Sequence, residues 1–230
     1  MQDKYKWIGP AYDFLSTVYG GKSIHNCKRA MLTDEHVKPG DKILIAGVGH
    51  GKDAIRAAEM GADVTVVDLS ETMLKKLQQA IDNHPADLKI NKVHSDILEF
   101  GECDHYDMVI ANFFLNVFYP DLMSKILGHL ITLVKPERGK MVIGDFSYPQ
   151  GNIVKRNLQK CYWYIAALIF YFATDNALHQ IYNYPELLKQ HGLTIKDRKD
   201  FSYLGLRCYT SVLGERASFH AEGMEQNRNN

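Results

Sequence analysis

The chain has no excess of charge of one sign and few cysteines. Each of these features excludes some classes of protein. Its 230 residues carry 27 basic and 27 acidic side chains, so no net field attracts a polyanion such as a nucleic acid. The four cysteines are Cys27, Cys103, Cys161 and Cys208, and no two form a C-x-x-C pair. This excludes the usual spacing of a zinc or redox motif. We expect free thiols and a cytoplasmic location.

Long apolar runs and metal-binding motifs are also missing. The apolar and aromatic run at 161–173 is shorter than the roughly 20 residues that a membrane-spanning helix needs. The N-terminus leads into no secretory apolar core, and no H-E-x-x-H motif occurs. We therefore predict no transmembrane segment and no metal. Peripheral contact with a membrane stays open, as does the oligomeric state.

Residues 43–53, Ile-Leu-Ile-Ala-Gly-Val-Gly-His-Gly-Lys-Asp, are the most informative segment present. Their apolar first half does not alternate with polar residues, which is typical of a parallel strand covered on both faces. The glycines that follow allow a ligand to approach the backbone, because no Cβ stands in the way. Their spacing is G-x-G-x-G, whereas a dinucleotide turn would need a third glycine where Lys52 stands. The spacing indicates a nucleoside site. A second strand pattern ends about twenty residues later in Asp68, a carboxylate that can bind a ribose.

Strand and helix patterns alternate along most of the chain. Strands are expected at 42–46, 63–67, 89–94, 108–111 and 140–144, and helices at 22–32, 53–60, 71–80, 122–134 and 187–191. A closing strand at 206–213 is expected to pair antiparallel with one near Ile195. The alternation predicts a parallel sheet with right-handed crossovers, whose ligand lies at the carboxyl ends of the strands.

The chain is long enough for one well-covered domain. We expect that domain over residues 1–213, with a helical N-terminal segment and an apolar helical insertion near 150–183. The aromatic run within the insertion suits either a buried core helix or a lid over a lipophilic acceptor. Residues 214–230 are polar, and we expect a mobile tail there.

The order of the motifs resembles that of class I S-adenosylmethionine-dependent methyltransferases. These motifs are the glycine turn, Asp68, the Ser-Asp-Ile run at 95–97 and the Tyr-Asp-Met-Val-Ile-Ala-Asn run at 106–112. The resemblance implies an α/β fold with a doubly wound, mostly parallel seven-stranded sheet, helices on both faces and an antiparallel last strand. It also implies that S-adenosyl-L-methionine is bound by Tyr12, Ala46, Gly47, Gly49, Gly51, Asp68, Leu69, Met73, Asp96, Ile97, Asn112 and Phe113.

Within that class, residues 5–213 resemble the ubiquinone and menaquinone biosynthesis C-methyltransferases. The matching stretches are Ala-Tyr-Asp-Phe-Leu at 11–15, Lys-Pro-Gly-Asp at 38–41, Asn-Val at 116–117, Val-Lys-Pro at 134–136 and Asp-Phe-Ser at 145–147. Three positions depart from the family. Ile45 replaces the acid that opens the glycine motif, Leu115 replaces an arginine thought to act in proton removal, and Gly139 is displaced by two residues.

Two other resemblances leave more than one class of methyl acceptor possible. The stretch at 44–53 is similar to the glycine motif of thiol and thiopurine methyltransferases, and the stretch at 172–181 is faintly similar to rhodoquinone-forming enzymes. Methyl transfer chiefly requires alignment of donor and nucleophile. A phenol, amine or thiol acceptor would also need a base, for which His50 and His179 are candidates, although each also suits a solvent-exposed position.

We therefore expect an enzyme that methylates a small, apolar or aromatic molecule by in-line transfer. The alternatives are a thiol methyltransferase, a quinone-modifying enzyme, a non-catalytic subunit that binds S-adenosylmethionine and, more distantly, an oxidoreductase.

Overall fold

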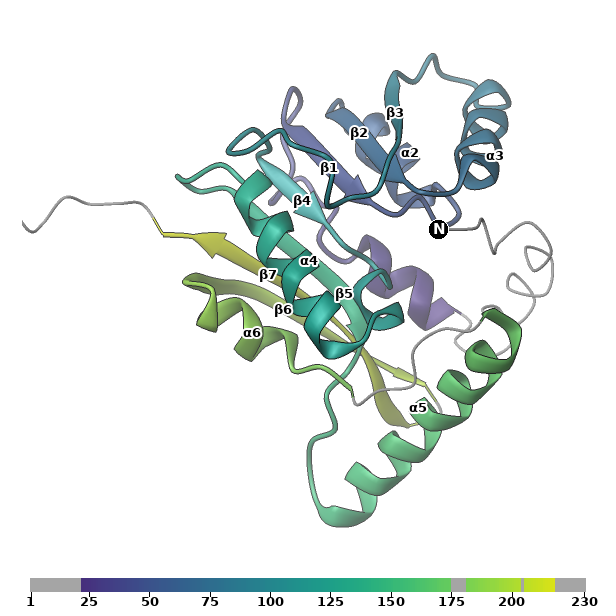
Figure 1. Cartoon of the computed structure of the whole chain (residues 1–230), viewed down its shortest axis with the longest axis vertical. Coiled ribbons are helices and arrows are strands. Elements are labelled where there is room, and N and C mark those ends of the chain that lie inside the picture. Colours follow the sequence, from purple (N-terminus) through teal and green to yellow (C-terminus); the bar gives the residue numbers. More distant parts are fainter. Residues whose placement is uncertain (1–21, 175–180, 204, 218–230) are drawn as a thin grey trace, which may run out of the picture.

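The computed structural model describes residues 22–174, 181–203 and 205–217, and its centre is one seven-stranded sheet (Figure 1). The strands are β1 (Lys42–Ala46), β2 (Asp63–Asp68), β3 (Ile90–His94), β4 (Met108–Ile110), β5 (Lys140–Phe146), β6 (Leu193–Tyr203) and β7 (Leu206–Arg216). They lie in the order β3-β2-β1-β4-β5-β7-β6. The first five pair in parallel, and β7 runs antiparallel to both of its neighbours. The predicted fold class is confirmed.

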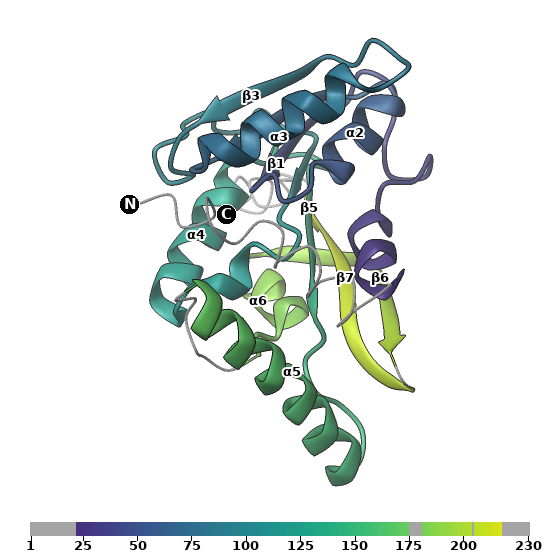
Figure 2. The ribbon, with the colours of Figure 1, turned by 90° about the vertical axis from the view of Figure 1, so that its right-hand side faces the viewer.

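Helices cover both faces of this sheet (Figure 2). They are a helix at 22–29, α2 (Lys52–Glu59), α3 (Glu71–Asp82), α4 (Pro120–Leu133), α5 (Ile153–Thr174) and α6 (Tyr184–Gln190), with a short 3₁₀ turn, η2 (Leu115–Val117). Ile43 and Ile45 of β1 pack in one buried cluster with residues of α2 and α3, whereas Leu44 and Ala46 pack in another with residues of α4 and α6. Because successive side chains of a strand point to opposite faces, burial on both sides explains why β1 is apolar without alternation.

The last strand extends further than the sequence indicated. β7 reaches Arg216, so its final three residues belong to the segment that was expected to form a polar tail. Gly214 pairs with Met141 on one side and with Ile195 on the other, so the strand stays paired on both sides here, although the register with β6 shifts between Ile195 and Asp197. The remainder of the expected tail, from residue 218, lies outside the described residues, as do the expected helix around 12–15 and part of the insertion, 175–180.

The aromatic run at 161–173, for which a buried core helix and a lid were the alternatives, is only partly buried. Trp163 is 4% exposed and packs inward, but Tyr164, Ile165 and Leu168 are 44 to 50% exposed. Nearer the start of α5, Ile153, Val154 and Leu158 are 50 to 74% exposed. The cause is the position of the helix, which packs against the end of the sheet and extends away from it (Figures 1 and 2). Within the described parts of the chain, no helix has the length and apolar character required to cross a membrane.

The contact between α4 and the sheet yields a stability prediction. Leu127 is fully buried in the cluster beneath α4, so Leu127→Ala should lower the free energy of unfolding by about 2 to 5 kcal/mol through lost apolar contact and a residual cavity. Urea unfolding followed by circular dichroism measures the change. Leu122→Ala, on the same helix but 37% exposed, is the matched control. Equal losses in the two variants would contradict this packing.

Candidate functional site

The loop between β1 and α2 is built on three glycines with left-handed backbones. Gly47, Gly49 and Gly51 have φ values of 76°, 49° and 70°, which side chains with a Cβ rarely adopt. The N–H of Gly47 donates to the Val67 carbonyl oxygen at 2.8 Å, which ties the start of the loop to β2. The sequence spacing therefore reflects a backbone conformation that this turn requires.

Only one of these glycines leaves space for something outside the protein. A Cβ at Gly47 would lie 2.7 Å from Cδ2 of Phe114, and one at Gly51 would lie 2.6 Å from Cδ1 of Leu77. At Gly49 the nearest atom to such a Cβ is Nζ of Lys28, at 3.5 Å. Gly47 and Gly51 thus make room for the protein's own side chains, and among the described residues only Lys28 lies near the space at Gly49.

Asp68 ends β2 and faces the glycine loop, as the sequence indicated. One of its carboxylate oxygens accepts a hydrogen bond from the N–H of Val48 at 2.6 Å, and the other accepts one from the N–H of Ser70 at 2.7 Å. Ser70 in turn caps α3, because its hydroxyl oxygen accepts from the N–H of Met73. The carboxylate of Asp68 thus ties the glycine loop to the start of α3.

The end of β3 lies beside that of β2. The N–H of Ser95 donates to the Asp68 carbonyl oxygen at 3.2 Å. Asp96 accepts from the N–H of Leu98 at 3.0 Å, which fixes the turn after the strand, and Ile97 is 6% exposed in the cluster beneath. The structure thus brings two predicted carboxylates to one edge of the sheet.

Asn112 has a structural role at this edge. Its amide nitrogen donates to the Lys28 carbonyl oxygen and to the Asp53 carboxylate, both at 2.9 Å. These bonds hold the helix at 22–29 against the start of α2, below the glycine loop, and use both donors of the amide. Its Oδ1 is buried and lies against Gly144 without a donor among the described residues.

Phe113 packs in an aromatic cluster. It is one of the few non-glycine residues in the described chain with a positive φ, 53°. Its ring lies edge-on to Phe146 and Tyr209, at centroid distances of 5.8 and 5.7 Å. The ammonium of Lys28 lies 5.5 Å from the Phe113 centroid, and the same ammonium is the neighbour of Gly49. Lys28 therefore places a positive charge beside the open part of the loop, a feature that the sequence pattern did not reveal.

The remaining predicted residues are dispersed or outside the described chain. Ala46 is buried, Leu69 is 40% exposed and His50 is exposed within the loop. Tyr12 and His179 lie outside the described residues. The roles assigned to these residues stay predictions. Across residues 22–174, 181–203 and 205–217, no group of His, Cys, Asp and Glu is arranged to hold a metal ion.

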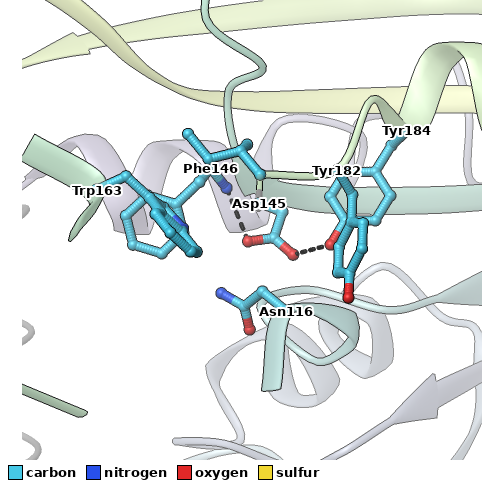
Figure 3. Close-up of a pocket in the computed structure, with 7 residues that line it drawn as sticks. Asn116, Asp145, Phe146, Trp163, Tyr182 and Tyr184 are labelled. Carbon is cyan, nitrogen blue, oxygen red and sulfur yellow. Dashed lines mark hydrogen bonds between the residues drawn. The ribbon is translucent and has the colours of Figure 1, made fainter. Parts of the chain in front are cut away.

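A buried carboxyl group at the end of β5 is the main feature that sequence reasoning missed. Asp145 is fully buried, and its carboxylate accepts hydrogen bonds from the backbone N–H of Phe146 and the hydroxyl of Tyr184, both at 2.7 Å (Figure 3). Burial raises its pKa to about 7, although hydrogen bonds from Tyr184, Phe146 and Asn116 and the charge of Lys28 oppose the shift. The sequence signal that could have indicated this group is an acidic residue directly after the apolar strand pattern at 140–144.

Aromatic and polar side chains converge around this carboxyl group. They come from η2, β5, α5 and the start of α6 and are Asn116, Phe146, Trp163, Ile181, Tyr182 and Tyr184 (Figure 3). They pack so closely that no space is left between them for a water molecule.

Three known proteins are similar in sequence or fold. Residues 43–137 match the family described as Methyltransferase domain. A segment of 175 residues, 74% of this chain, is 30% identical to the demethylmenaquinone methyltransferase of Clavibacter sepedonicus and covers 67% of that protein. A segment of 102 residues, 44% of this chain, is 32% identical to the ribosomal protein L11 methyltransferase of Acetivibrio thermocellus, of which it covers 32%. The chain thus spans about a third to two thirds of these relatives.

One similar solved structure is the magnesium protoporphyrin IX methyltransferase from Synechocystis PCC 6803 with bound S-adenosylhomocysteine. The TM-score is 0.64 at 20% sequence identity, over 87% of this chain and 84% of that chain. At this identity the similarity concerns the fold, and it extends the sequence match over most of the sheet.

The raised pKa of Asp145 makes stability depend on pH in a defined direction. The carboxyl group ionises near 3.8 in an unfolded chain and near about 7 in the folded protein. The stability that it contributes is complete below pH 3.8 and is lost as the pH rises to about 7. Asp145→Asn cannot ionise, so its free energy of unfolding, relative to wild type, should increase between pH 5 and pH 7 by on the order of 2 to 3 kcal/mol.

Urea unfolding at four pH values between 5 and 8 measures this difference. Asp121→Asn, at an exposed position in the first turn of α4, is the control and should track wild type. A difference between Asp145→Asn and wild type that stays constant with pH would contradict the shifted ionisation.

Proposed function

Because the chain belongs to the class I S-adenosylmethionine-dependent methyltransferases, we propose that it transfers a methyl group to a small apolar or aromatic molecule. The use of S-adenosyl-L-methionine follows from the family. The nature of the acceptor is the proposal, and the observation that supports it is the group of aromatic side chains around Asp145 at the carboxyl edge of the sheet. The even balance of charge also favours a small acceptor over a nucleic acid.

The residues around the glycine loop fit the donor. Gly49 has open space on its exposed side, Lys28 lies beside it as a partner for the carboxylate of the methionine part, and the Asp68 carboxylate lies against the same loop, where a ribose hydroxyl could donate to it. The bound donor supplies an electrophilic methyl group on a sulfonium. What the protein supplies is alignment and the exclusion of water.

A quinone-type acceptor is the more specific candidate, and one observation favours it. The relative with 67% coverage is named a demethylmenaquinone methyltransferase. The family arginine is nevertheless Leu115 here, and that side chain is fully buried. Proton removal from such an acceptor would therefore require a different group in this chain.

The donor site predicts a loss of affinity when Asp68 is changed. Asp68→Asn should weaken binding of S-adenosylhomocysteine by on the order of 10- to 100-fold, because charge-assisted hydrogen bonds to the sugar and to the Val48 N–H are lost. Isothermal titration calorimetry measures the change, and thermal unfolding checks that the variant is folded. Asp87→Asn, at an exposed loop position, is the control.

Two results would count against the proposed function. Unchanged affinity in a folded Asp68→Asn protein would remove Asp68 from the donor site. Wild-type protein that binds neither S-adenosylmethionine nor S-adenosylhomocysteine, or that binds NAD more tightly than either, would contradict methyl transfer itself.

A further inference from the structure

The helix α5 exposes an apolar face to solvent. At about 3.6 residues per turn, six exposed apolar side chains fall within an arc of roughly 140° on this helix: Ile153, Val154, Leu158, Tyr164, Ile165 and Leu168. We call this set the α5 stripe. Single exposed apolar residues need no explanation, but a contiguous exposed group of them marks a surface that binds something.

Contacts with the sheet fix which side of α5 faces outward. Gln159 and Trp163 are buried, and the helical period places both on the side opposite the α5 stripe. The Tyr162 hydroxyl lies 2.6 Å from the Tyr209 hydroxyl of β7, and the side-chain oxygen of Gln159 accepts from the Gln150 N–H at 2.9 Å. The α5 stripe therefore cannot turn inward unless these contacts break.

The first turns of α5 also project from the molecule. Both views place the start of the helix at one end of the long axis, beyond the other helices and strands drawn in colour (Figures 1 and 2). A broad, flat partner can therefore contact these turns without meeting the sheet.

The charges on α5 indicate which kind of partner fits. Lys155, Arg156 and Lys160 are exposed, and no acidic residue occurs from 146 to 174, although the whole chain has 27 basic and 27 acidic residues. By the helical period, Lys155 and Lys160 border the α5 stripe on its two sides. Two of the cations lie in the first turn, which holds no acidic residue, and cations there oppose the helix dipole. They do not serve the stability of the helix, but they complement a partner that is apolar and negatively charged.

We propose that the α5 stripe docks on the surface of an anionic phospholipid bilayer, with its apolar side chains among the acyl chains and its lysines at the headgroups. Basic residues beside an apolar helix face are typical of helices that lie in the membrane interface. Long lysine side chains suit the border of such a face, because their stems cover apolar surface while their ammonium groups stay in water. The inference does not depend on the proposed function, although an apolar methyl acceptor would partition into the same bilayer.

A second copy of the chain fits the α5 stripe less well. In a twofold dimer the same surface contacts itself, so two α5 helices would meet with three cations each and no acidic residue on either. Like charges in this arrangement repel one another. The charge pattern thus favours lipid phosphate groups as the partner.

The test measures co-flotation of the full chain with phosphatidylcholine vesicles that contain either no phosphatidylserine or about 30% of it. We expect binding to the anionic vesicles that decreases as salt is added, and binding to the neutral vesicles that is weaker by on the order of 10-fold or more. Ile153→Gln/Leu158→Gln should weaken binding by on the order of 10- to 100-fold, because two large apolar side chains no longer leave water. Lys155→Gln/Lys160→Gln should weaken it by on the order of 10- to 30-fold at low salt, because two charges near the anionic surface are lost.

The double variant Leu122→Gln/Lys125→Gln is the matched control. It changes one exposed apolar and one exposed basic residue of α4, and it should bind vesicles like wild type. Thermal unfolding followed by circular dichroism checks that each variant is folded.

A fluorophore that is sensitive to polarity locates the contact. Cys161 is an exposed thiol within the arc of the α5 stripe, and Cys103 is an exposed thiol in the loop before β4. Each is labelled in a variant in which the other is changed to serine. Emission from Cys161 should shift to shorter wavelength when anionic vesicles are added, and emission from Cys103 should not.

Three results would overturn the proposal. Folded wild type that binds neither kind of vesicle excludes a lipid partner. Binding that is equal for neutral and anionic vesicles, or that is unchanged in both α5 variants, removes the α5 stripe and its lysines as the docking surface. A Cys161 probe that already reports an apolar environment without vesicles shows that a second copy, or another segment of the chain, covers the stripe. None of these results depends on S-adenosylhomocysteine binding, so this inference and the proposed function can fail separately.

Discussion

The hydrogen bond from the Val48 N–H to the Asp68 carboxylate is the interaction on which the site depends. It joins the loop after β1 to the end of β2 at 2.6 Å. The Gly47 N–H reinforces the same connection by donating to β2. A loop of left-handed glycines has few intrinsic restraints, so these bonds fix its path. The nucleoside site is a property of two neighbouring strand ends held at fixed separation, and the glycine sequence alone would not create it.

Much of the fold could be predicted from the sequence, because its strongest signals are local. The ends of the five parallel strands and three crossover helices were predicted to within two residues, since apolar runs and helical periods do not depend on distant contacts. The position of Asp68 was predictable for the same reason. The carboxyl ends of parallel strands necessarily share one edge of the sheet.

What could not be predicted depends on contacts between segments that are far apart in the chain. Asn112 was expected to contact the donor, but its amide binds Lys28 and Asp53, which are 84 and 59 residues away. Asp145 was recognised only as part of a family stretch, because nothing local shows that Tyr184, 39 residues later, covers it. The apolar composition of α5 indicated burial, but composition does not reveal that the helix extends beyond the sheet, where one side has nothing to pack against among the described residues.

The double hydrogen bond of Asn112 also has a consequence for the order in which the molecule assembles. The helix at 22–29 precedes β1 in the chain. The group that binds its Lys28 carbonyl oxygen is the Asn112 amide, which follows β4. Closing a connection of that length before other contacts exist is entropically unfavourable. We therefore expect the helix to dock late, after β1 and β4 have paired. During synthesis on the ribosome, the Lys28 side of the donor site would then stay incomplete until the fourth strand has emerged.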